Sequence, residues 1–429
     1  MTPWLGAAYR AAARTAEILS LVTPRAAPGK LGKTFSARRG IHARYRLWGA
    51  SGRDRSRPLL WFHAASVGEG LMALPVLQSV RRALPNVQIA YTFFSPSAEG
   101  LAGQMGADFS DYLPFDSVRS ARIALDALDP TALIFTKGDV WPALASEAAS
   151  QGVRLALISG SMPASSLRAT AAGGLITRDA YRALDLVGAA SSDDASRIIE
   201  AGARAERVRI TGDTRYDQAW TRAYAEPRNA DLVAQLASSR PTLVAGSTWR
   251  SDERELFPAW IALRDAVPAA RLVIAPHELS DSHSASVIEW AKTHALSVAR
   301  AADSTPDTDV VIVDRMGVLA DLYSVATIAY VGGGFHAAGL HSLVEPAVFR
   351  VPVLVGPRNA DSRDARLMLA AGGAISVDER TVLARTMVRL MTDRRERADR
   401  SDAIGTVVAA ELGAVDRSFE IVRELLRPV

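Results

Sequence analysis

Glu69 stands in a segment whose residue types suit anion binding and the removal of a proton. The segment 63–70 reads His-Ala-Ala-Ser-Val-Gly-Glu-Gly and follows the apolar run 58–63. Ser66 and the glycines let a ligand approach the backbone, and the start of a helix offers free N–H groups to an anion. A carboxylate there can act as a general base, which is the role we expect for Glu69. The alternative is that Glu69 only complements the helix dipole.

The second half of the chain has a comparable arrangement after its own apolar runs. Gly246, Ser247 and Thr248 follow one run and precede a helix, which favours the binding of an anion. His277 ends the next run, and Gly333 lies in a glycine-rich turn. That turn is neither the dinucleotide GxGxxG pattern nor a P-loop, so its composition alone names no ligand.

Histidines gather after the apolar runs. Four of the seven stand there, at positions 63, 277, 336 and 341. Because no HExxH or comparable spacing is present, we expect hydrogen bonds to phosphate or sugar and no bound metal. A core or surface role is the alternative for each histidine taken singly.

Two loops of the first half carry further polar side chains. Ser95 lies in the hydroxyl-rich loop 92–99, and Lys137 and Asp139 follow the apolar run 132–136. The Lys–Asp pair can neutralise an acidic substrate, and it can equally be a solvated ion pair of the loop.

Short apolar runs alternate with helical stretches from residue 58 onward, which indicates parallel sheets built from βαβ units. The expected strands are 58–63, 87–92, 132–136, 153–158, 185–189, 207–211, 241–246, 271–275, 309–313, 327–331 and 351–355. The expected helices include 69–84, 141–151, 193–202, 253–265, 363–371 and 402–427.

The polar segment 218–240, which contains a proline, separates two series of strands. We therefore expect two doubly wound, Rossmann-like domains facing a cleft, over 51–225 and 236–429, with the last helix able to return to the first domain. Ligands of such sheets bind at the carboxyl ends of the strands, where the candidate residues stand.

The charge is unevenly distributed. Residues 1–58 carry twelve Arg and Lys against two acidic residues, an excess of +10, while the whole chain has a net charge of +4. Residues 3–22 read as a helix with Arg10, Arg14 and Glu17 on one face. We expect residues 1–50 to bind an anionic membrane surface, with the helix in the interface and basic residues facing headgroups. An amphipathic helix packed on its own domain is the alternative. Nucleic acid is disfavoured as a partner because no second basic stripe is present.

Composition excludes several classes of protein. With 429 residues, 48% of them hydrophobic, the chain has ample material for folded domains. It has no cysteine, which excludes a disulfide scaffold, a thiol nucleophile and metal sites built on thiolates.

Taken together, the motifs resemble those of the 3-deoxy-D-manno-octulosonic acid (Kdo) transferases, and they occur in that family's order over about residues 30–380. They are HAASVGEG (63–70), TFFSPSAEG (92–100), YLPFD (112–116), KGDVWP (137–142), TGDTRYD (211–217), AGSTW (245–249), APHE (275–278) and 317–357, which contains YVGGGF and GLHSLVEPAVF.

The resemblance implies a GT-B fold and an inverting glycosyltransferase that moves Kdo from CMP-Kdo to the lipid A precursor, in lipopolysaccharide biosynthesis, without a metal or other cofactor. It implies that the first domain binds the acceptor and the second the donor, at the cytoplasmic face of the bacterial inner membrane. Glu69 matches the family's base. The donor residues would be Gly246, Ser247, Thr248, His277, Gly333, His341, Ser342 and Glu345. The acceptor or sugar-acid residues would be Ser66, Ser95, Lys137, Asp139 and Arg215.

The sequence departs from the family pattern at three places. Lys137, Gly138 and Asp139 replace an acidic Glu-Thr-Glu, Ser342 replaces an Asn after His341, and Arg215 replaces a Lys. These departures indicate a divergent branch and leave the acceptor and the number of sugars transferred open. Another GT-B nucleotide-sugar transferase, a sugar-nucleotide epimerase and a non-catalytic glycolipid-binding relative remain alternatives.

Overall fold

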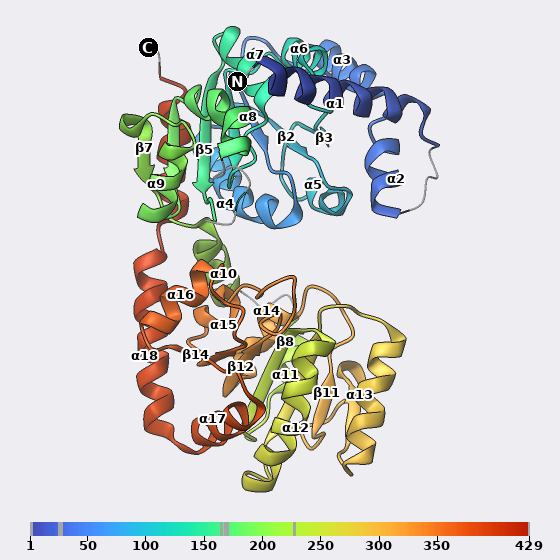
Figure 1. Cartoon of the computed structure of the whole chain (residues 1–429), viewed down its shortest axis with the longest axis vertical. Helices are drawn as coiled ribbons and strands as arrows, with labels where there is room; N and C mark the ends of the chain where they lie inside the picture. Colours follow the sequence, from blue (N-terminus) through green and yellow to red (C-terminus); the bar gives the residue numbers. More distant parts are fainter. Residues whose placement is uncertain (1–2, 25–28, 164–165, 167–170, 226–228, 428–429) are drawn as a thin grey trace. The chain divides into compact units, whose positions relative to one another are not determined.

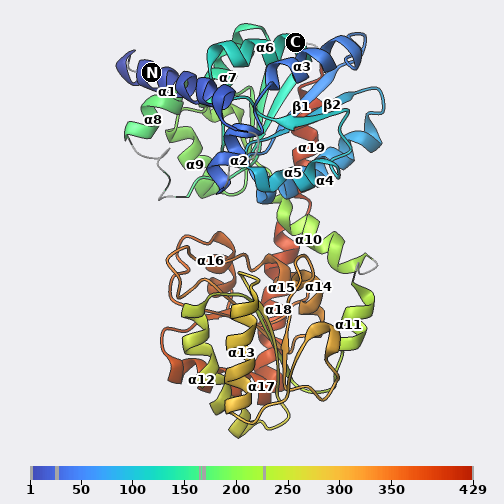
Figure 2. The same ribbon diagram turned by 90° about the vertical axis from the view of Figure 1, so that its right-hand side faces the viewer.

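The computed structural model describes residues 3–24, 29–163, 166, 171–225 and 229–427. The chain divides into two compact units. The first comprises Met1–Gln218 and Leu412–Val429, and the second comprises Ala219–Glu411. Figures 1 and 2 show that each unit is a twisted sheet with helices on both of its faces.

The first unit has a sheet of seven parallel strands in the order β3-β2-β1-β4-β5-β6-β7. Its strands are β1 (Leu59–His63), β2 (Gln88–Phe93), β3 (Phe109–Tyr112), β4 (Ala132–Thr136), β5 (Arg154–Gly160), β6 (Leu186–Ala189) and β7 (Val208–Ile210). The central strands β1, β2 and β4 are buried along their whole length, which explains their uninterrupted apolar runs. The strand order reverses between β1 and β4, the position where ligands of such sheets bind.

The helices of this unit follow the strands. Beyond the N-terminal segment they are α4 (Val67–Ala83), α5 (Glu99–Ala102), α6 (Val118–Leu128), α7 (Pro142–Ser150), α8 (Ala171–Arg182), α9 (Ser192–Glu200) and α19 (Ala414–Glu424), with α10 (Thr214–Tyr224) crossing the boundary between the units. Helices α6, α7 and α8 contact one another in sequence on one face, and α4 packs with α19 on the other (Figure 2).

The second unit repeats the design with the strand order β10-β11-β9-β8-β12-β13-β14, again all parallel. Its strands are β8 (Thr242–Thr248), β9 (Arg271–Pro276), β10 (Val298–Arg300), β11 (Val310–Ile312), β12 (Ile328–Val331), β13 (Val353–Val355) and β14 (Ala374–Ser376). Here the order reverses between β8 and β12, so the loops after these two strands define the expected binding edge.

Helices also cover both faces of the second sheet. They are α11 (Ala230–Leu236), α12 (Arg250–Ala266), α13 (Asp281–Thr293), α14 (Leu319–Leu322), α15 (Val344–Val348), α16 (Arg363–Ala370), α17 (Arg380–Thr392) and α18 (Arg394–Glu411). Helix α17 packs on α12, whereas α18 packs on α15 and α16.

The N-terminal segment forms α1 (Pro3–Val22), α2 (Gly29–Ser36) and α3 (Ile41–Ser51). Helix α1 turns polar groups toward its own unit: the Tyr9 hydroxyl donates to Asp116 at 2.6 Å, and Glu17 accepts from the Ser117 hydroxyl at 2.8 Å. Arg14 is exposed, and the side chain of Arg10 lies outside the described residues.

Two of the basic residues expected to face headgroups are instead used inside the unit. Arg38 is buried over the rings of Phe94 and Phe115, and its guanidinium donates to the backbone oxygens of Leu113 and Phe94. Burial lowers its pKa to about 10. Arg44 makes a bidentate ion pair with Asp111 at 2.7 and 2.8 Å. Some of the basic residues of the N-terminal segment therefore contribute to the packing of the first unit.

The apolar side of this segment points away from the unit. Ile18, Leu19, Leu21 and Val22 of α1, Leu31 of α2 and Leu47 of α3 are between 46% and 76% exposed. Within the described residues, no helix has the length and apolar character needed to cross a membrane.

The division of the chain differs from the expected domain boundaries. The first unit ends within α10, at Gln218, and α11 of the expected linker belongs to the second unit. Instead of one helix over 402–427, α18 ends at Glu411 and α19 begins after Gly413. Gly413 has a φ of 84°, which favours glycine, and its N–H donates to Asp217 at 2.7 Å, so the turn is fixed.

Shortening a buried side chain of α19 tests whether this last helix completes the first unit. Ile421 is buried and lies against β6 beside Gly188. Ile421→Ala should lower the local unfolding free energy of β5 and β6 by about 2–4 kcal/mol through lost burial and the cavity left behind. Hydrogen exchange of peptides from these strands measures it. Ile199→Ala, at a half-exposed position of α9 in the same unit, should change little; equal effects of the two variants would contradict the assignment.

Candidate active site

Glu69 lies in the first turn of α4, at the carboxyl end of β1. Its side chain is 8% exposed, and its Oε2 accepts a hydrogen bond from Ala65 N at 2.7 Å. Ser66 caps the helix, accepting from Glu69 N at 3.5 Å. The bond from Ala65 N to the Glu69 carboxylate stabilises the start of the helix, as expected if Glu69 only complements the helix dipole. The same bond also holds the carboxylate in one place. A carboxylate can accept about four hydrogen bonds, so the cap and a role as base are compatible.

The surroundings of Glu69 are closely packed. Tyr91 of β2 is buried, and its burial together with the charge of Glu69 raises the pKa of its hydroxyl well above the usual value. A Cβ at Gly70 would lie 2.7 Å from that hydroxyl and 2.6 Å from Leu101. A side chain at position 70 would therefore have to displace Tyr91 and Leu101.

The loops after β1, β2 and β4 lie at one edge of the sheet, because these strands are parallel neighbours. They carry Ser66, Ser95 and the Lys137–Asp139 segment. Ser95 Oγ lies 2.8 Å from Ser97 Oγ, Lys137 is exposed and Asp139 is half-buried. Lys137 has a φ of 69°, an unfavourable conformation for a residue other than glycine. Hydrogen bonds from its N–H to Ile158 O and from Ser161 N to its carbonyl hold it there.

Arg215 reaches the same side of the unit from the start of α10. The neighbouring Thr214 donates to Met72 O of α4 at 2.8 Å and contacts Ser159 at the end of β5 at 2.9 Å. Asp213 holds the Arg215 guanidinium, with Nε–Oδ2 at 2.9 Å. The arginine is thus oriented by a buried carboxylate.

His63 turns inward and is structural. Its Nε2 accepts from the Trp141 indole N–H at 2.9 Å, and its Nδ1 lies 3.0 Å from Thr92 Oγ1. Burial lowers its pKa to about 3, so the ring is neutral. Of the expectations raised for this histidine, the core role is the one that the structure supports.

In the second unit, the buried carboxylate of Asp252 organises the loops after β8 and β12. It accepts from Trp249 N and Gly333 N at 2.9 and 2.8 Å, from Phe335 N at 3.1 Å and from the Tyr330 hydroxyl at 3.0 Å. The start of α12 and the glycine-rich turn are thereby tied to one side chain.

Aromatic rings cluster above this carboxylate. Trp249 stacks on His336 with ring centroids 4.0 Å apart and on His277 at 4.3 Å. His277 lies 4.6 Å from His341, whose Nε2 accepts from the Trp249 indole N–H at 3.3 Å. Three of the histidines expected at strand ends are therefore brought together, and they meet around a tryptophan.

The glycine-rich turn is compact. A Cβ at Gly246 would lie 2.1 Å from the Tyr323 hydroxyl, and one at Gly333 would lie 2.2 Å from Gly339 O. Gly333 also has a φ of 95°. A side chain at position 333 would clash with the backbone, and one at position 246 would displace Tyr323, so both glycines allow close packing of the loops.

Ser247 and Thr248 differ in their surroundings. Thr248 is buried, and its hydroxyl donates to Glu253 at 2.8 Å, while His283 contacts the same carboxylate at 2.8 Å. The Thr248 side chain thus belongs to an internal network. Ser247 is half-buried and has a φ of 53°.

Ser342 and Glu345 flank the start of α15. The exposed Ser342 donates to Asp364 at 3.0 Å. Burial raises the pKa of Glu345, while Arg222, which is paired with Asp321 at 3.1 Å, opposes that shift. Burial thus favours the neutral form of this carboxyl.

Sequence reasoning missed Trp249 and Asp252 as members of the site. Trp249 directly follows Thr248 in the anion-binding stretch, and Asp252 stands at the expected helix start, so their positions were the available signal. Within the described part of the chain, no group of three or more His, Asp and Glu side chains is arranged to hold a metal ion.

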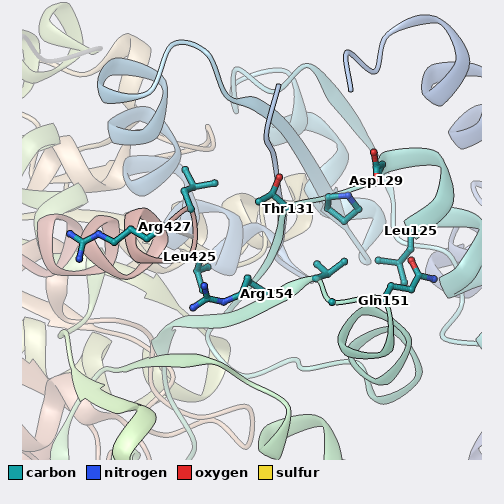
Figure 3. Close-up of a pocket in the computed structure, with 11 residues that line it drawn as sticks. Leu125, Asp129, Thr131, Gln151, Arg154, Leu425 and Arg427 are labelled. Carbon is teal, nitrogen blue, oxygen red and sulfur yellow. The ribbon is translucent and has the colours of Figure 1, made fainter. Parts of the chain in front are cut away.

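A pocket of about 420 Å³ in the first unit lies away from these residues (Figure 3). It is lined by Thr131, Arg154, Leu425 and Arg427 among others, next to the amino ends of β4 and β5. Glu69 follows the carboxyl end of β1, at the opposite edge of the sheet. The pocket is therefore separate from the candidate active site.

Two doubly wound units with polar loops at the points where strand order reverses define the GT-B class. Solved structures support this fold. The UDP-GlcNAc 2-epimerase of Neisseria meningitidis matches with a TM-score of 0.63 at 14% identity, covering 86% of this chain and 99% of that one. The epimerase of Methanocaldococcus jannaschii has a TM-score of 0.59 at 10% identity, covering 79% and 94%. At these identities the likeness concerns the fold alone.

Sequence relatives identify the family. Residues 35–218 match the family described as 3-deoxy-D-manno-octulosonic-acid transferase (kdotransferase). The 3-deoxy-D-manno-octulosonic acid transferase of Bordetella pertussis is 30% identical over 394 residues, 88% of this chain and 91% of the relative. That of Aquifex aeolicus is 27% identical, covering 79% and 87%. The chain belongs to the Kdo transferase family and is a Kdo-transferring glycosyltransferase.

Replacing Asp252 tests how the loops after β8 and β12 are held. In the wild type, backbone N–H groups donate to both oxygens of Asp252. In Asp252→Asn one of these oxygens becomes an NH2 group, which cannot accept. We therefore expect the free energy of unfolding of the second unit to fall by about 2–4 kcal/mol. Urea unfolding followed by tryptophan fluorescence and by hydrogen exchange of residues 330–336 measures it. Asp307→Asn, at an exposed position of the same unit, is the control. Equal stability of the two variants would contradict the role of Asp252.

Proposed function

We propose that the chain transfers Kdo from CMP-Kdo to the lipid A precursor in lipopolysaccharide biosynthesis, with inversion at the anomeric carbon. The observation that carries the proposal is the carboxylate of Glu69, held at the carboxyl end of β1 in a chain of the Kdo transferase family. In this proposal the first unit binds the acceptor and the second unit binds the donor.

The chemistry of the donor suits the second unit. CMP-Kdo carries a phosphodiester and a sugar carboxylate, and both are anions. The imidazoles of His277 and His341, whose ring centroids lie 4.6 Å apart, offer N–H donors to these anions. Such prearranged donors stabilise a departing phosphate without reorganisation during the reaction.

The proposed reaction is a single displacement. Glu69 takes the proton of an acceptor hydroxyl while that oxygen bonds to the anomeric carbon of Kdo. The bond between this carbon and the phosphate oxygen breaks at the same time, and CMP leaves with the electron pair. On the acceptor side, Lys137 and Arg215 supply positive charge for the phosphates of the lipid A precursor, and Ser66, Ser95 and Asp139 supply hydrogen-bonding groups.

The departures at Lys137, Gly138 and Asp139 bear on the non-catalytic alternative. The strained backbone of Lys137 supports a functional role for this loop, since such conformations persist where the surroundings enforce them. Retention of Glu69 likewise favours an active enzyme over a glycolipid-binding relative.

Removing the carboxylate tests the proposed base. Glu69→Gln keeps an oxygen that can accept from Ala65 N but cannot take a proton, so we expect kcat to fall by about 10²–10⁴-fold. The assay uses the full chain with CMP-Kdo and a tetraacylated lipid A precursor, and circular dichroism checks the fold. Glu200→Gln, at an exposed position on α9, should retain full activity. An unaffected Glu69→Gln enzyme would remove Glu69 from the mechanism, and an inactive wild-type enzyme would refute the proposed reaction.

We also propose that no metal ion takes part, because the donors named above can stabilise the leaving phosphate. Activity with CMP-Kdo should then be the same after dialysis against EDTA, with or without added Mg²⁺. A loss in EDTA that Mg²⁺ restores would contradict this proposal.

The N-terminal segment supports a peripheral or monotopic location at the cytoplasmic face of the inner membrane. Its polar residues Tyr9 and Glu17 are bonded to the first unit, so its exposed apolar side chains remain for another partner. Lys30, Lys33, Arg39 and Arg46 are exposed nearby in sequence on α2, α3 and the turn between them. Apolar side chains with a basic border fit an anionic lipid surface.

Vesicle binding tests the membrane proposal. Leu21→Glu and Leu47→Glu should each weaken binding to phosphatidylglycerol-containing vesicles at least about tenfold, because a leucine is lost from the apolar side and a negative charge is gained. Sedimentation with the vesicles measures it. Ile210→Glu, equally exposed but on β7, should bind like the wild type. Unchanged binding of both leucine variants would contradict the proposal.

A further inference from the structure

Trp249, at the end of the loop after β8, is held by a backbone hydrogen bond and by two stacked imidazole rings. Its backbone N–H donates to Asp252 at 2.9 Å. Its indole ring lies between the imidazoles of His336, 4.0 Å away and only 3° from parallel, and His277, 4.3 Å away. His336 is itself held, since its Nδ1 accepts from Ala338 N at 3.1 Å. A ring fixed in this way points its single N–H in one direction.

That N–H decides where His341 carries its proton. An indole nitrogen can only donate, so His341 Nε2, 3.3 Å away, must be the acceptor. The proton of the neutral imidazole then resides on Nδ1. Among the described residues, Nδ1 of His341 has no hydrogen-bond partner, and the side chain is half-exposed. An N–H donor is therefore available to a ligand.

The first unit also contains a tryptophan that donates to a histidine, but both nitrogens of that histidine have partners. There the Trp141 indole donates to His63 Nε2 at 2.9 Å, but Nδ1 of His63 is satisfied by Thr92 at 3.0 Å inside the core. In both pairs a tryptophan fixes the tautomer of the histidine. They differ at Nδ1, which is bonded inside the core in His63 and is accessible to a ligand in His341.

The groups around His341 favour its neutral form. Burial lowers its pKa, the neighbouring His277 and His336 lower it further, and Asp252 opposes them. The pair with Trp249 acts in the same direction, because protonation at Nε2 would set two N–H groups against each other. Neutral His341 therefore prevails above its lowered pKa.

We propose that Trp249 is a positioning residue that fixes the Nδ1–H tautomer of His341 and so presents this N–H to an anionic oxygen of the donor, the phosphate of a nucleoside-monophosphate sugar. The assignment of that ligand rests on the proposed function. The tautomer itself is a property of the free protein and can be measured without substrate.

Nitrogen-15 NMR of the imidazole rings in the full chain provides the first test. His341 is assigned by comparison with His341→Asn, and His63 serves as an internal reference for a ring with Nδ1–H. We expect the wild type to show Nδ1–H for His341. Trp249→Phe retains an aromatic ring but has no N–H, so the Nε2–H form should appear and the pKa of His341 should rise. Trp290→Phe, which alters a ring stacked on Phe257 elsewhere in the unit, is the matched control and should change neither. A wild-type Nε2–H form, or an unchanged tautomer in Trp249→Phe, overturns the proposal.

Kinetics with CMP-Kdo provides the second test. Trp249→Phe should raise KM for the donor roughly 3- to 10-fold, because one hydrogen bond to the phosphate is weakened, and kcat should fall as well because the same bond stabilises the leaving phosphate. In His341→Asn the amide nitrogen occupies the place of Nδ1 and has fixed hydrogens, so adding Trp249→Phe should raise KM no further. An equal additional rise in the double variant would indicate a merely structural tryptophan and overturn the proposal. A wild-type enzyme that does not use CMP-Kdo refutes the proposed function, whereas the NMR result decides the role of Trp249 separately.

Discussion

Buried carboxylates that accept backbone N–H groups hold the loops of both units in place. A turn at the end of a strand leaves N–H groups without partners, and leaving them buried and unpaired would be costly. Asp252 accepts three such groups after β8 and β12, and Asp116 accepts two at the start of α7, from Ala143 and Leu144 at 2.9 and 2.8 Å. The buried Asp194 accepts from Met162 N, and the half-buried Asp217 accepts from Gly413 N. The geometry of the candidate site therefore depends on side chains beneath it that need not contact substrate.

The residues that hold the loops in place are therefore different from the residues that can contact a ligand. In the first unit, Asp116 binds the hydroxyl of Tyr9 as well as the start of α7, which links the N-terminal helix to the element that follows the Lys137–Asp139 loop. In the second unit, Asp252 supports Trp249, and Trp249 contacts His277, His336 and His341. In the second unit, the histidines that can contact a ligand are thus held by Trp249, and Trp249 is held by Asp252.

Much of the fold could be predicted from the sequence because buried parallel strands are uninterrupted apolar runs. The strand β3 was missed because Ser110 and Asp111 interrupt its apolar pattern, and Asp111 is paired with Arg44. The edge strands β10 and β14 were missed because they are only partly buried and contain the polar residues Arg300 and Ser376, whereas the equally short β11 and β13 are buried and wholly apolar. The break at Gly413 was missed because the helical pattern on both sides is strong.

The candidate site was predictable in position but only partly in detail. The strand ends indicated Glu69 in the first unit and His277 and His341 in the second, since the parallel strands within each sheet have their carboxyl ends at one edge. The inward turn of His63 depends on Trp141, and the ring cluster depends on residues 249, 277, 336 and 341, which are distant along the chain. No local spacing encodes such meetings. These contacts depend on which strands are neighbours in the sheet, and the order of strands in a sheet cannot be read from local spacing in one sequence.

The first unit is interrupted in sequence by the second, and this affects how the chain is made. Its sheet is translated early, but α19, which packs on α4, β5 and β6, emerges from the ribosome only after the whole second unit. Throughout the synthesis of residues 219–411, the apolar surface later hidden under Ile421 and Val422 stays uncovered. Chaperones bind such exposed apolar surface, and a chain that stops at residue 411 has a complete second unit and an unfinished first one.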